Sequence, residues 1–410
     1  MSICINKIKT VIALFMVIMM ACESKPGKVT FTDNKVHQSE LSEKELYDKV
    51  LGSLVGSAIG DAMGAPTEMW GRNEIEAEYG FIDGLDSMIR EPSPEGTWKM
   101  NLPAGGTTDD TRWKDLTYHF LMNQPSQSIN AKDFAAHILS RYRNAIDQYG
   151  KIKSFEPDPY EENTLKVAWL QEWAKVAKPY VEGNLDQFQS NLNKFYGGEM
   201  VCAGLLFAPA IGAFYPGDPV SAYTNAYAIS IYDIGYARDI TGLASALTAA
   251  GMKKDATKQD LMETARSLDP ESFFKSRLVG RTAYRIFQEA KFIVRKSKSD
   301  TINPLKTAFK MLDDHQQDMP FHAGEIYLQV MTAMIYADFD FQKTMEFLVN
   351  YGRDNDTTSA IAGGITGALC GYERLPGTKI KVMEVTKKEL NIDLENLAQQ
   401  MTKKIIELRK

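Results

Sequence analysis

Hydrophobic residues recur every three or four positions along most of the chain, which is the pattern of amphipathic helices. The first such run follows Ser42 and Glu45, whose spacing predicts a capping box at the start of a helix. Leu46, Val50 and Leu54 then repeat at intervals of four, and a neighbouring apolar stripe widens the apolar face. We therefore expect this helix to be buried.

Further segments show the same helical periodicity, at about residues 110–122, 131–149, 163–176, 220–250, 281–296, 325–337, 341–351, 357–369 and 390–408. Strands with alternating apolar and polar residues are hard to find, and no unit of roughly 20–50 residues repeats. The uncharged stretch 200–214 is too short to cross a membrane, so we expect a core helix interrupted at Pro209. The pattern predicts one all-α domain over residues 41–410.

The segment before this domain has a different pattern. A short basic stretch precedes an apolar run at residues 11–20, which is too short to span a bilayer. A small residue and Cys22 follow, so residues 1–21 are predicted to be a secretory signal peptide that resembles a bacterial lipoprotein signal. Lipid on Cys22 would anchor the protein to a membrane of the cell envelope, on its periplasmic or cell-surface face. The alternative is a plain signal peptide with an incidental cysteine. Polar residues 22–40 are predicted to form a tether.

Composition narrows the classes of function. Hydrophobic residues make up 44% of the chain and charged residues 24%, which is an ordinary globular balance. The net charge of −6 and the lack of a Lys/Arg tract argue against a nucleic-acid partner. No Cys-x-x-Cys pair is present, and Cys202 and Cys370 are expected to be buried, inert thiols. The sequence motifs of zincins, serine hydrolases and P-loop proteins are also absent.

Three clusters combine small residues with acidic ones. In the first, at residues 52–68, glycines recur every four residues along one helix face, which allows a backbone or a ligand to approach closely. Asp61 and Glu68 lie at the end of this smooth face, where Pro66 should end the helix. A tightly packed helix with a solvated acidic end would also explain this cluster.

The second cluster, residues 105–113, places two adjacent carboxylates at the start of a helix. Thr108 is expected to cap this helix, and Asp109 and Asp110 lie in its first turn, where the helix dipole favours negative charge. Capping alone would explain one of the two carboxylates. Together with Thr108 and Thr111, however, the pair forms a compact set of hard oxygen ligands suited to Mg²⁺ or Mn²⁺.

The third cluster, residues 352–371, has the same character. Asp354, Asp356 and Thr357 place two carboxylates and a hydroxyl ahead of a nearly uncharged helix. An EF-hand loop would need Gly and Glu at later positions where this chain has other residues, so that alternative fails. Four carboxylates brought together from the two clusters would repel one another unless cations neutralise them. A site for two metal ions is therefore the economical hypothesis.

In combination these clusters resemble the motifs of the ADP-ribosylglycohydrolase family, also called the dinitrogenase-reductase-activating glycohydrolase type. The resemblance covers about residues 46–371 and rests on GxxxGDAxGxxxE, TDDT and GxDxDTxxAIAGxxxGAxxG. It implies a compact all-α domain with two Mg²⁺ or Mn²⁺ ions at the base of a cleft. It also implies hydrolysis of the bond that joins ADP-ribose to a protein side chain or a small molecule.

The resemblance also implies roles for individual residues. The metal ligands would be Thr108, Asp109, Asp110, Asp354, Asp356 and Thr357. Asp61 and Glu68 would lie at the substrate, and we expect Glu68 to position the attacking water, with Asp110 as the alternative catalytic residue. His322 and Glu325 could border the cleft or cap the helix that follows them.

The resemblance is incomplete where the substrate binds. Many family members have Met-Arg in a loop that contacts ADP-ribose, whereas residues 197–212 have Leu205 and Leu206 there. A Thr-His pair often found downstream is replaced within residues 230–239. The prediction is a metal-dependent hydrolase of a glycosidic bond to ADP-ribose or a related ribosyl or glycosyl group. The alternatives are a non-catalytic ligand-binding lipoprotein and a glycosidase of the same fold that acts on another sugar.

Overall fold

The computed structural model describes residues 40–89, 101–149, 155, 167–276 and 278–409. Within residues Gln38–Lys410, which form one compact unit, the fold is all-α as predicted, apart from a two-residue antiparallel ladder. None of the described helices is long and apolar enough to cross a membrane. The predicted signal peptide, Cys22 and the tether as far as residue 39 lie outside the described residues.

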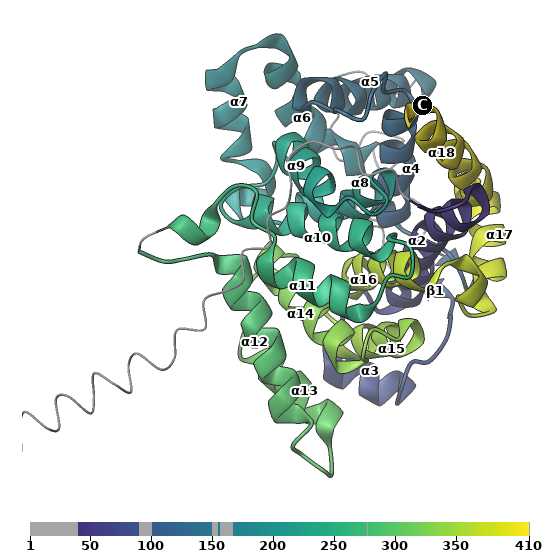
Figure 1. Cartoon of the computed structure of the whole chain (residues 1–410), viewed down its shortest axis with the longest axis vertical. Coiled ribbons are helices and arrows are strands. Elements are labelled where there is room, and N and C mark those ends of the chain that lie inside the picture. The colour runs from purple at the N-terminus through teal and green to yellow at the C-terminus, as the bar shows by residue number, and fades with distance from the viewer. Residues whose placement is uncertain (1–39, 90–100, 150–154, 156–166, 277, 410) are drawn as a thin grey trace, which may run out of the picture. The chain divides into compact units, whose positions relative to one another are not determined.

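The described elements follow one another along the chain mostly as helices (Figure 1). The α-helices are α2 (Glu43–Gly64), α3 (Arg72–Tyr79), α4 (Asp109–Met122), α5 (Ala131–Tyr149), α6 (Ala168–Glu182), α7 (Leu185–Leu192), α8 (Ala208–Phe214), α9 (Pro219–Ile229), α10 (Ala237–Gly251), α11 (Lys258–Ser267), α12 (Thr282–Ser297), α13 (Pro304–Asp313), α14 (Ala323–Tyr336), α15 (Phe341–Tyr351), α16 (Asn355–Cys370), α17 (Thr378–Leu390) and α18 (Leu394–Leu408). The short 3₁₀ segments are η1 (Ala65–Thr67), η3 (Phe195–Gly198), η4 (Ala203–Leu206), η5 (Phe273–Lys275) and η6 (Tyr372–Arg374). The ladder pairs β1 (Met88–Ile89) with β2 (Asn101–Leu102).

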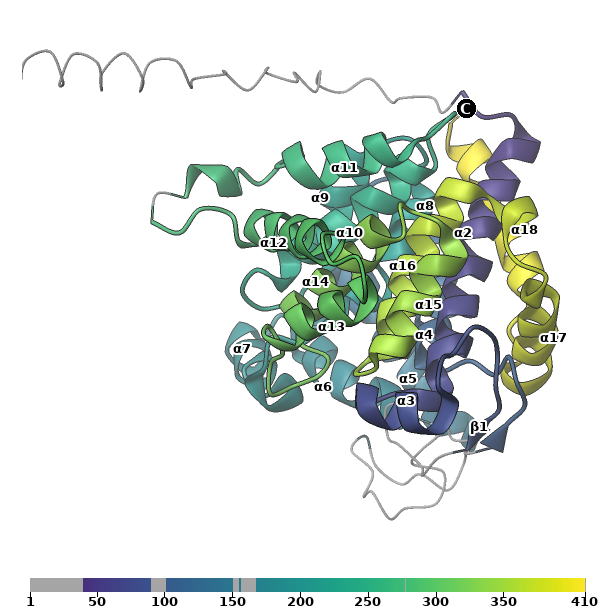
Figure 2. The same cartoon turned by 90° about the horizontal axis from the view of Figure 1, so that it is seen from below.

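Helices α2 and α16 lie side by side and pack backbone against backbone (Figure 2). A Cβ atom at Gly56 would lie 2.5 Å from the carbonyl oxygen of Gly363, and one at Gly52 would lie 2.6 Å from that of Gly367. Only glycine permits such a close approach. The glycine repeat of the first cluster is therefore a helix-packing surface, and the buried helix predicted after Ser42 is confirmed. Helices α10 and α15 contact α16, whereas α17 and α18 contact α2.

Some predicted helices are wrong in extent. Residues 220–250 form two helices, α9 and α10, and the turn between them includes Gly235 with φ of +56°. Residues 390–408 are likewise divided, because α17 ends at Leu390 and Asp393 caps α18. Residues 200–214 form η4 and then α8, and Pro209 lies in the first turn of α8 instead of interrupting a helix. Proline is tolerated there because its missing amide would have no partner within the helix.

Candidate metal centre

One pocket gathers residues from all three acidic clusters. It has about 480 Å³ of empty volume. The polar residues that line it are Glu68, Asp109, Asp354, Asp356 and Thr357. The larger apolar and aromatic residues that line it are Met69, Trp173, Tyr196, Leu206 and Phe321. The clusters at residues 52–68, 105–113 and 352–371 thus meet at one place, as the sequence hypothesis required.

Three carboxylates from two distant segments converge in this pocket. One oxygen atom from each of Glu68, Asp354 and Asp356 lies within 4.8 Å of the other two. Asp354 and Asp356 are buried, and Glu68 is partly exposed. Burial raises the pKa of Asp354 well above its usual range, and repulsion from Asp356 and Glu68 raises it further. Hard oxygen donors crowded in this way fit a divalent cation, which would relieve their repulsion.

Asp61 fixes the start of α4 and does not line the pocket. Its fully buried carboxylate accepts hydrogen bonds of 2.6–3.1 Å from the backbone amides and the hydroxyl groups of Thr108 and Thr111. Burial raises the pKa of Asp61 to about 7, with further contributions from Asp110 and Asp356. Asp61 therefore positions the start of α4, and its predicted contact with substrate stays a prediction.

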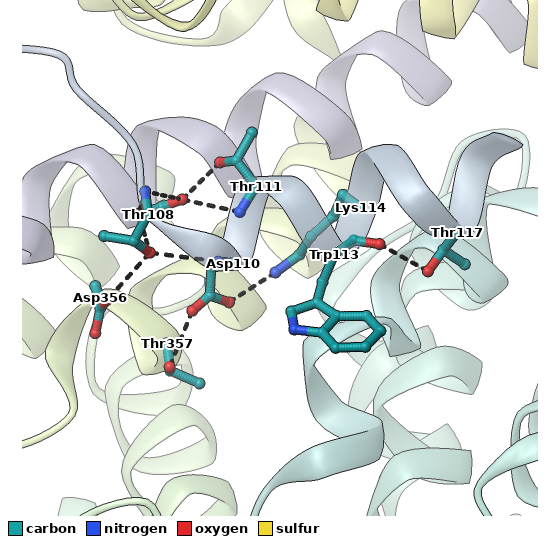
Figure 3. Close-up of polar contacts among 9 residues, drawn as sticks. Thr108, Asp110, Thr111, Trp113, Lys114, Thr117, Asp356 and Thr357 are labelled. Atoms are coloured by element: carbon teal, nitrogen blue, oxygen red, sulfur yellow. Dashed lines mark hydrogen bonds and ion pairs between the residues drawn. The ribbon is translucent and has the colours of Figure 1, made fainter. Parts of the chain in front are cut away.

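Asp110 is held differently from the carboxylates that line the pocket (Figure 3). Its Oδ1 accepts a hydrogen bond of 2.8 Å from Nζ of Lys114, and its Oδ2 accepts one of 3.0 Å from the hydroxyl of Thr357. Both members of the Asp110–Lys114 ion pair have side chains that are 2% exposed. Asp110 does not line the pocket, whereas its neighbour Asp109 does. Sequence reasoning missed Lys114, although residues four apart on a helix are neighbours.

A backbone bridge brings Glu68 and Asp354 together. The amide of Met69 donates a hydrogen bond of 2.7 Å to the carbonyl oxygen of Arg353, and the amide of Arg353 donates one of 3.0 Å to the carbonyl oxygen of Trp70. Met69 and Arg353 have φ angles of +66° and +65°, in the left-handed region that non-glycine residues rarely adopt. The bridge therefore holds two strained loops against each other and places one carboxylate on each side.

Glu325 and His322 support this loop and α14 without lining the pocket. The carboxylate of Glu325 accepts hydrogen bonds of 2.8 and 2.9 Å from Nε and Nη2 of Arg353, and one of 2.7 Å from the amide of Gln317. Nδ1 of His322 accepts a hydrogen bond of 3.2 Å from the amide of Gly324 at the start of α14. Capping is thus confirmed for His322, whereas Glu325 forms an ion pair with Arg353.

The segments that depart from the family motifs form part of the pocket wall. Leu206 lines the pocket, and the amide of Gly204 in the same turn donates a hydrogen bond of 2.8 Å to Asp233. The hydroxyl of Thr241 donates another, of 2.6 Å, to the same carboxylate. Burial raises the pKa of Asp233 to about 6. Among the described residues that line this pocket there is no Lys, Arg or His.

This all-α fold around an acidic pocket is that of a known glycohydrolase family. The family model described as ADP-ribosylglycohydrolase matches residues 42–409, and the chain belongs to that family. A solved structure titled "ADP-ribosylglycohydrolase-related protein complex" has a TM-score of 0.54 and 18% sequence identity, covering 88% of this chain and 99% of that one. At this identity the likeness shows the fold alone. "Uncharacterized protein YegU" of Escherichia coli (strain K12) is 50% identical over 36 residues, which are 9% of this chain and 11% of that protein.

Proposed function

We propose that this chain is a divalent-cation-dependent hydrolase that cleaves a glycosidic bond to ADP-ribose or to a related ribosyl or glycosyl group. The convergence of Glu68, Asp354 and Asp356 in one pocket carries the proposal. Membership of a glycohydrolase family supports it. The cation would be Mg²⁺ or Mn²⁺, because the available donors are carboxylate and hydroxyl oxygens.

The residues of the pocket divide into those that would hold the cation and one that would move a proton. Asp354 and Asp356 are the buried donors, and Thr357 adds a hydroxyl from the first turn of α16. When bound, a divalent cation polarises the reacting group and lowers the pKa of a bound water. Glu68 is the most exposed carboxylate of the three, so we assign it the removal of a proton from the attacking water.

Glu68 is a better candidate for this step than Asp110. Both oxygens of Asp110 accept hydrogen bonds from buried side chains, and Asp110 lies outside the pocket lining. Cleavage of a glycosidic bond builds positive charge on the sugar as the leaving group departs, and a carboxylate nearby stabilises that charge. Asp109, which lines the pocket from the start of α4, is placed to contribute to that stabilisation.

A glycoside without a diphosphate is the second candidate substrate, favoured by the lining of the pocket. Cationic side chains commonly recognise diphosphate groups, and none is among the described residues that line this pocket. The described lining is acidic on one side and carries Trp173, Tyr196 and Phe321 on the other. Aromatic faces of this kind suit an apolar or aromatic leaving group.

A panel of substrates tests the proposal. The metal-free chain would be resupplied with Mg²⁺ or Mn²⁺ and incubated with ADP-ribosyl-arginine, ADP-ribosyl-serine, O-acetyl-ADP-ribose and unphosphorylated ribosides, and the released sugar measured by mass spectrometry. Metal-dependent release from the ADP-ribosyl compounds supports the first substrate, and release from the unphosphorylated ribosides alone supports the second. Asp356→Asn should abolish release, whereas Asp338→Asn, in an exposed ion pair with Lys258, should not. If metal binds but no compound of the panel releases sugar, the result would favour a non-catalytic ligand-binding lipoprotein.

We also propose that lipid on Cys22 anchors the chain to a membrane of the cell envelope. The proposal rests on the basic stretch, the apolar run and the small residue that precede this cysteine. Metabolic labelling of the expressed full chain with an alkyne fatty acid tests it. We expect the label on the full chain and its loss in Cys22→Ser, and a label that persists in that variant would contradict the proposal.

A further inference from the structure

Lys114 is a buried cation beside the proposed metal centre. Its side chain is 2% exposed, and its Nζ lies 2.8 Å from Oδ1 of Asp110 (Figure 3). The adjacent Trp113 is fully buried, and its ring packs against those of Trp169 and Trp173. A lysine ammonium in such surroundings is stable only while it keeps an anionic partner, because it has lost its water. The Asp110 carboxylate is that partner.

Asp110 is separate from the three carboxylates that converge. Among the described residues, the carboxylates whose oxygens lie within 4.8 Å of one another are Glu68, Asp354 and Asp356. The negative charge of Asp110 is already balanced within the chain, by Lys114. Its second oxygen accepts the hydroxyl hydrogen of Thr357, which lines the pocket. Lys114 therefore holds Thr357 in place through Asp110.

A second divalent cation at Asp110 would lie close to the Lys114 ammonium. Two positive charges in a buried, weakly screened site repel each other strongly. The ammonium also takes a carboxylate oxygen that such a cation would need. The clustered carboxylates need positive charge to neutralise them, and the Lys114 ammonium supplies part of that charge.

We propose that the Lys114 ammonium replaces one of the two divalent cations implied by the sequence motifs, so that the chain binds one ion, held by Asp354 and Asp356 beside Glu68. This inference rests on the proposed function, since it assumes that the acidic pocket binds a divalent cation. Lys114 is a positioning residue in this arrangement, because it acts on the pocket through Asp110 and Thr357.

Metal stoichiometry tests the inference without any substrate. The full chain would be stripped of metal, reconstituted with Mn²⁺, freed of unbound ion and analysed by mass spectrometry of the metal and by electron paramagnetic resonance. We expect one Mn²⁺ per chain with the spectrum of an isolated ion. Lys114→Met should bind two ions, which would show magnetic coupling. Lys258→Met, which removes a lysine from an exposed ion pair with Asp338, should still bind one.

A double variant keeps the test interpretable if Lys114→Met fails to fold. Lys114→Met leaves Asp110 without its counter-charge, whereas Lys114→Met/Asp110→Asn replaces both charges by neutral groups of similar size, which proteins tolerate better. The double variant should fold and keep one ion. Two ions in the unchanged chain, one ion in folded Lys114→Met, or none in the double variant would each overturn the inference. A chain that binds no Mn²⁺ at all would instead overturn the proposed function.

Discussion

The backbone amide of Met69 donates a hydrogen bond of 2.7 Å to the carbonyl oxygen of Arg353, and so joins two loops that are far apart in the sequence. Both residues adopt left-handed backbone conformations, each of which costs roughly 1–3 kcal/mol for a residue other than glycine. Glu68 precedes the first and Asp354 follows the second. The bridge therefore sets the separation of two carboxylates in the proposed metal centre. The strained backbone conformations of Met69 and Arg353 lie next to the two carboxylates that they position.

Gly352 allows this bridge to form. Its φ is +87°, and a Cβ atom there would lie 2.5 Å from the carbonyl oxygen of Trp70. Gly352→Ala should therefore lower the free energy of unfolding by roughly 1–3 kcal/mol and weaken Mn²⁺ binding. Gly377→Ala is the matched control, because no atom lies within 4 Å of its added Cβ. Urea unfolding and Mn²⁺ titration would measure both effects, and equal behaviour of the two variants would contradict the role of the bridge.

Glu325 anchors the same loop through an ion pair with Arg353, in which the Glu325 side chain is 2% exposed and the Arg353 side chain 19%. Glu325→Gln should destabilise the fold by roughly 3 kcal/mol, since it leaves the Arg353 guanidinium without its counter-charge. Glu373→Gln changes an exposed pair with Lys44, at 3.6 Å, and should cost less than about 1 kcal/mol. Urea unfolding of the two variants and of the unchanged chain would measure these losses in the free energy of unfolding. A loss for Glu325→Gln as small as that of the control would show that the pair does not hold the loop.

Stability of the metal-free chain should fall as pH rises. Burial raises the pKa of Asp61 to about 7 and that of Asp354 well above its usual range, whereas both groups titrate near 4 in an unfolded chain. The folded state therefore binds more protons at Asp61 between roughly pH 4 and pH 7, and loses about 1.4 kcal/mol per pH unit from this group across that window. Asp354 contributes in the same direction. A bound cation favours the ionised forms.

The stabilisation by Mn²⁺ should accordingly grow across the same window. Calorimetric unfolding at pH 5 and pH 7.5, with and without Mn²⁺, would measure it. The metal-free chain should have the lower Tm at pH 7.5, and the increase in Tm on adding Mn²⁺ should be larger there. An increase that is the same at both pH values would argue that Asp354 does not hold the ion.

Glu68 should matter for turnover more than Asp110 does. Glu68→Gln should lower kcat by roughly 10²–10⁴-fold at saturating Mn²⁺, because the amide cannot accept the proton of the attacking water. The double variant Lys114→Met/Asp110→Asn should keep kcat within about tenfold, since Asp110 lies outside the pocket lining and the amide oxygen of an asparagine can still accept the hydroxyl hydrogen of Thr357. Steady-state kinetics on the best substrate of the panel would compare them. Full turnover by Glu68→Gln would contradict the assignment of Glu68 as the residue that removes a proton from the attacking water.

Much of the fold could be predicted because its signals are local. The capping box of Ser42 and Glu45 is present, and α4 begins at Asp109 with Thr108 as its cap, as expected. Helices α3, α7, α11 and α13 were missed, because they have only 8–10 residues and so few turns over which a period can show. The 13-residue helix α17 was missed as well. The division of residues 220–250 depends on how α9 packs against α10, which periodicity does not encode.

The sequence singled out residues that the structure brings into one pocket, but Thr108 and Asp110 of the predicted ligand set do not line that pocket. Motif spacing identified Glu68, Asp354 and Asp356, which the fold brings together. The role of Asp61 depends on α2 lying against the start of α4, which is a tertiary contact. Lys114 stands at helical spacing from Asp110, but the sequence does not show that both are buried, and burial is what makes their pairing obligatory.

The most direct test of the metal-dependent hydrolase is a titration of Mn²⁺ into the metal-free chain in which bound ion and released sugar are measured on the same samples. The rate should be zero without metal, rise in proportion to the bound Mn²⁺ and saturate with it. Asp354→Asn should weaken binding and turnover together. Sugar release that persists at full rate in the metal-free chain, with a chelator present, would contradict the assignment of this pocket as a metal-dependent active site.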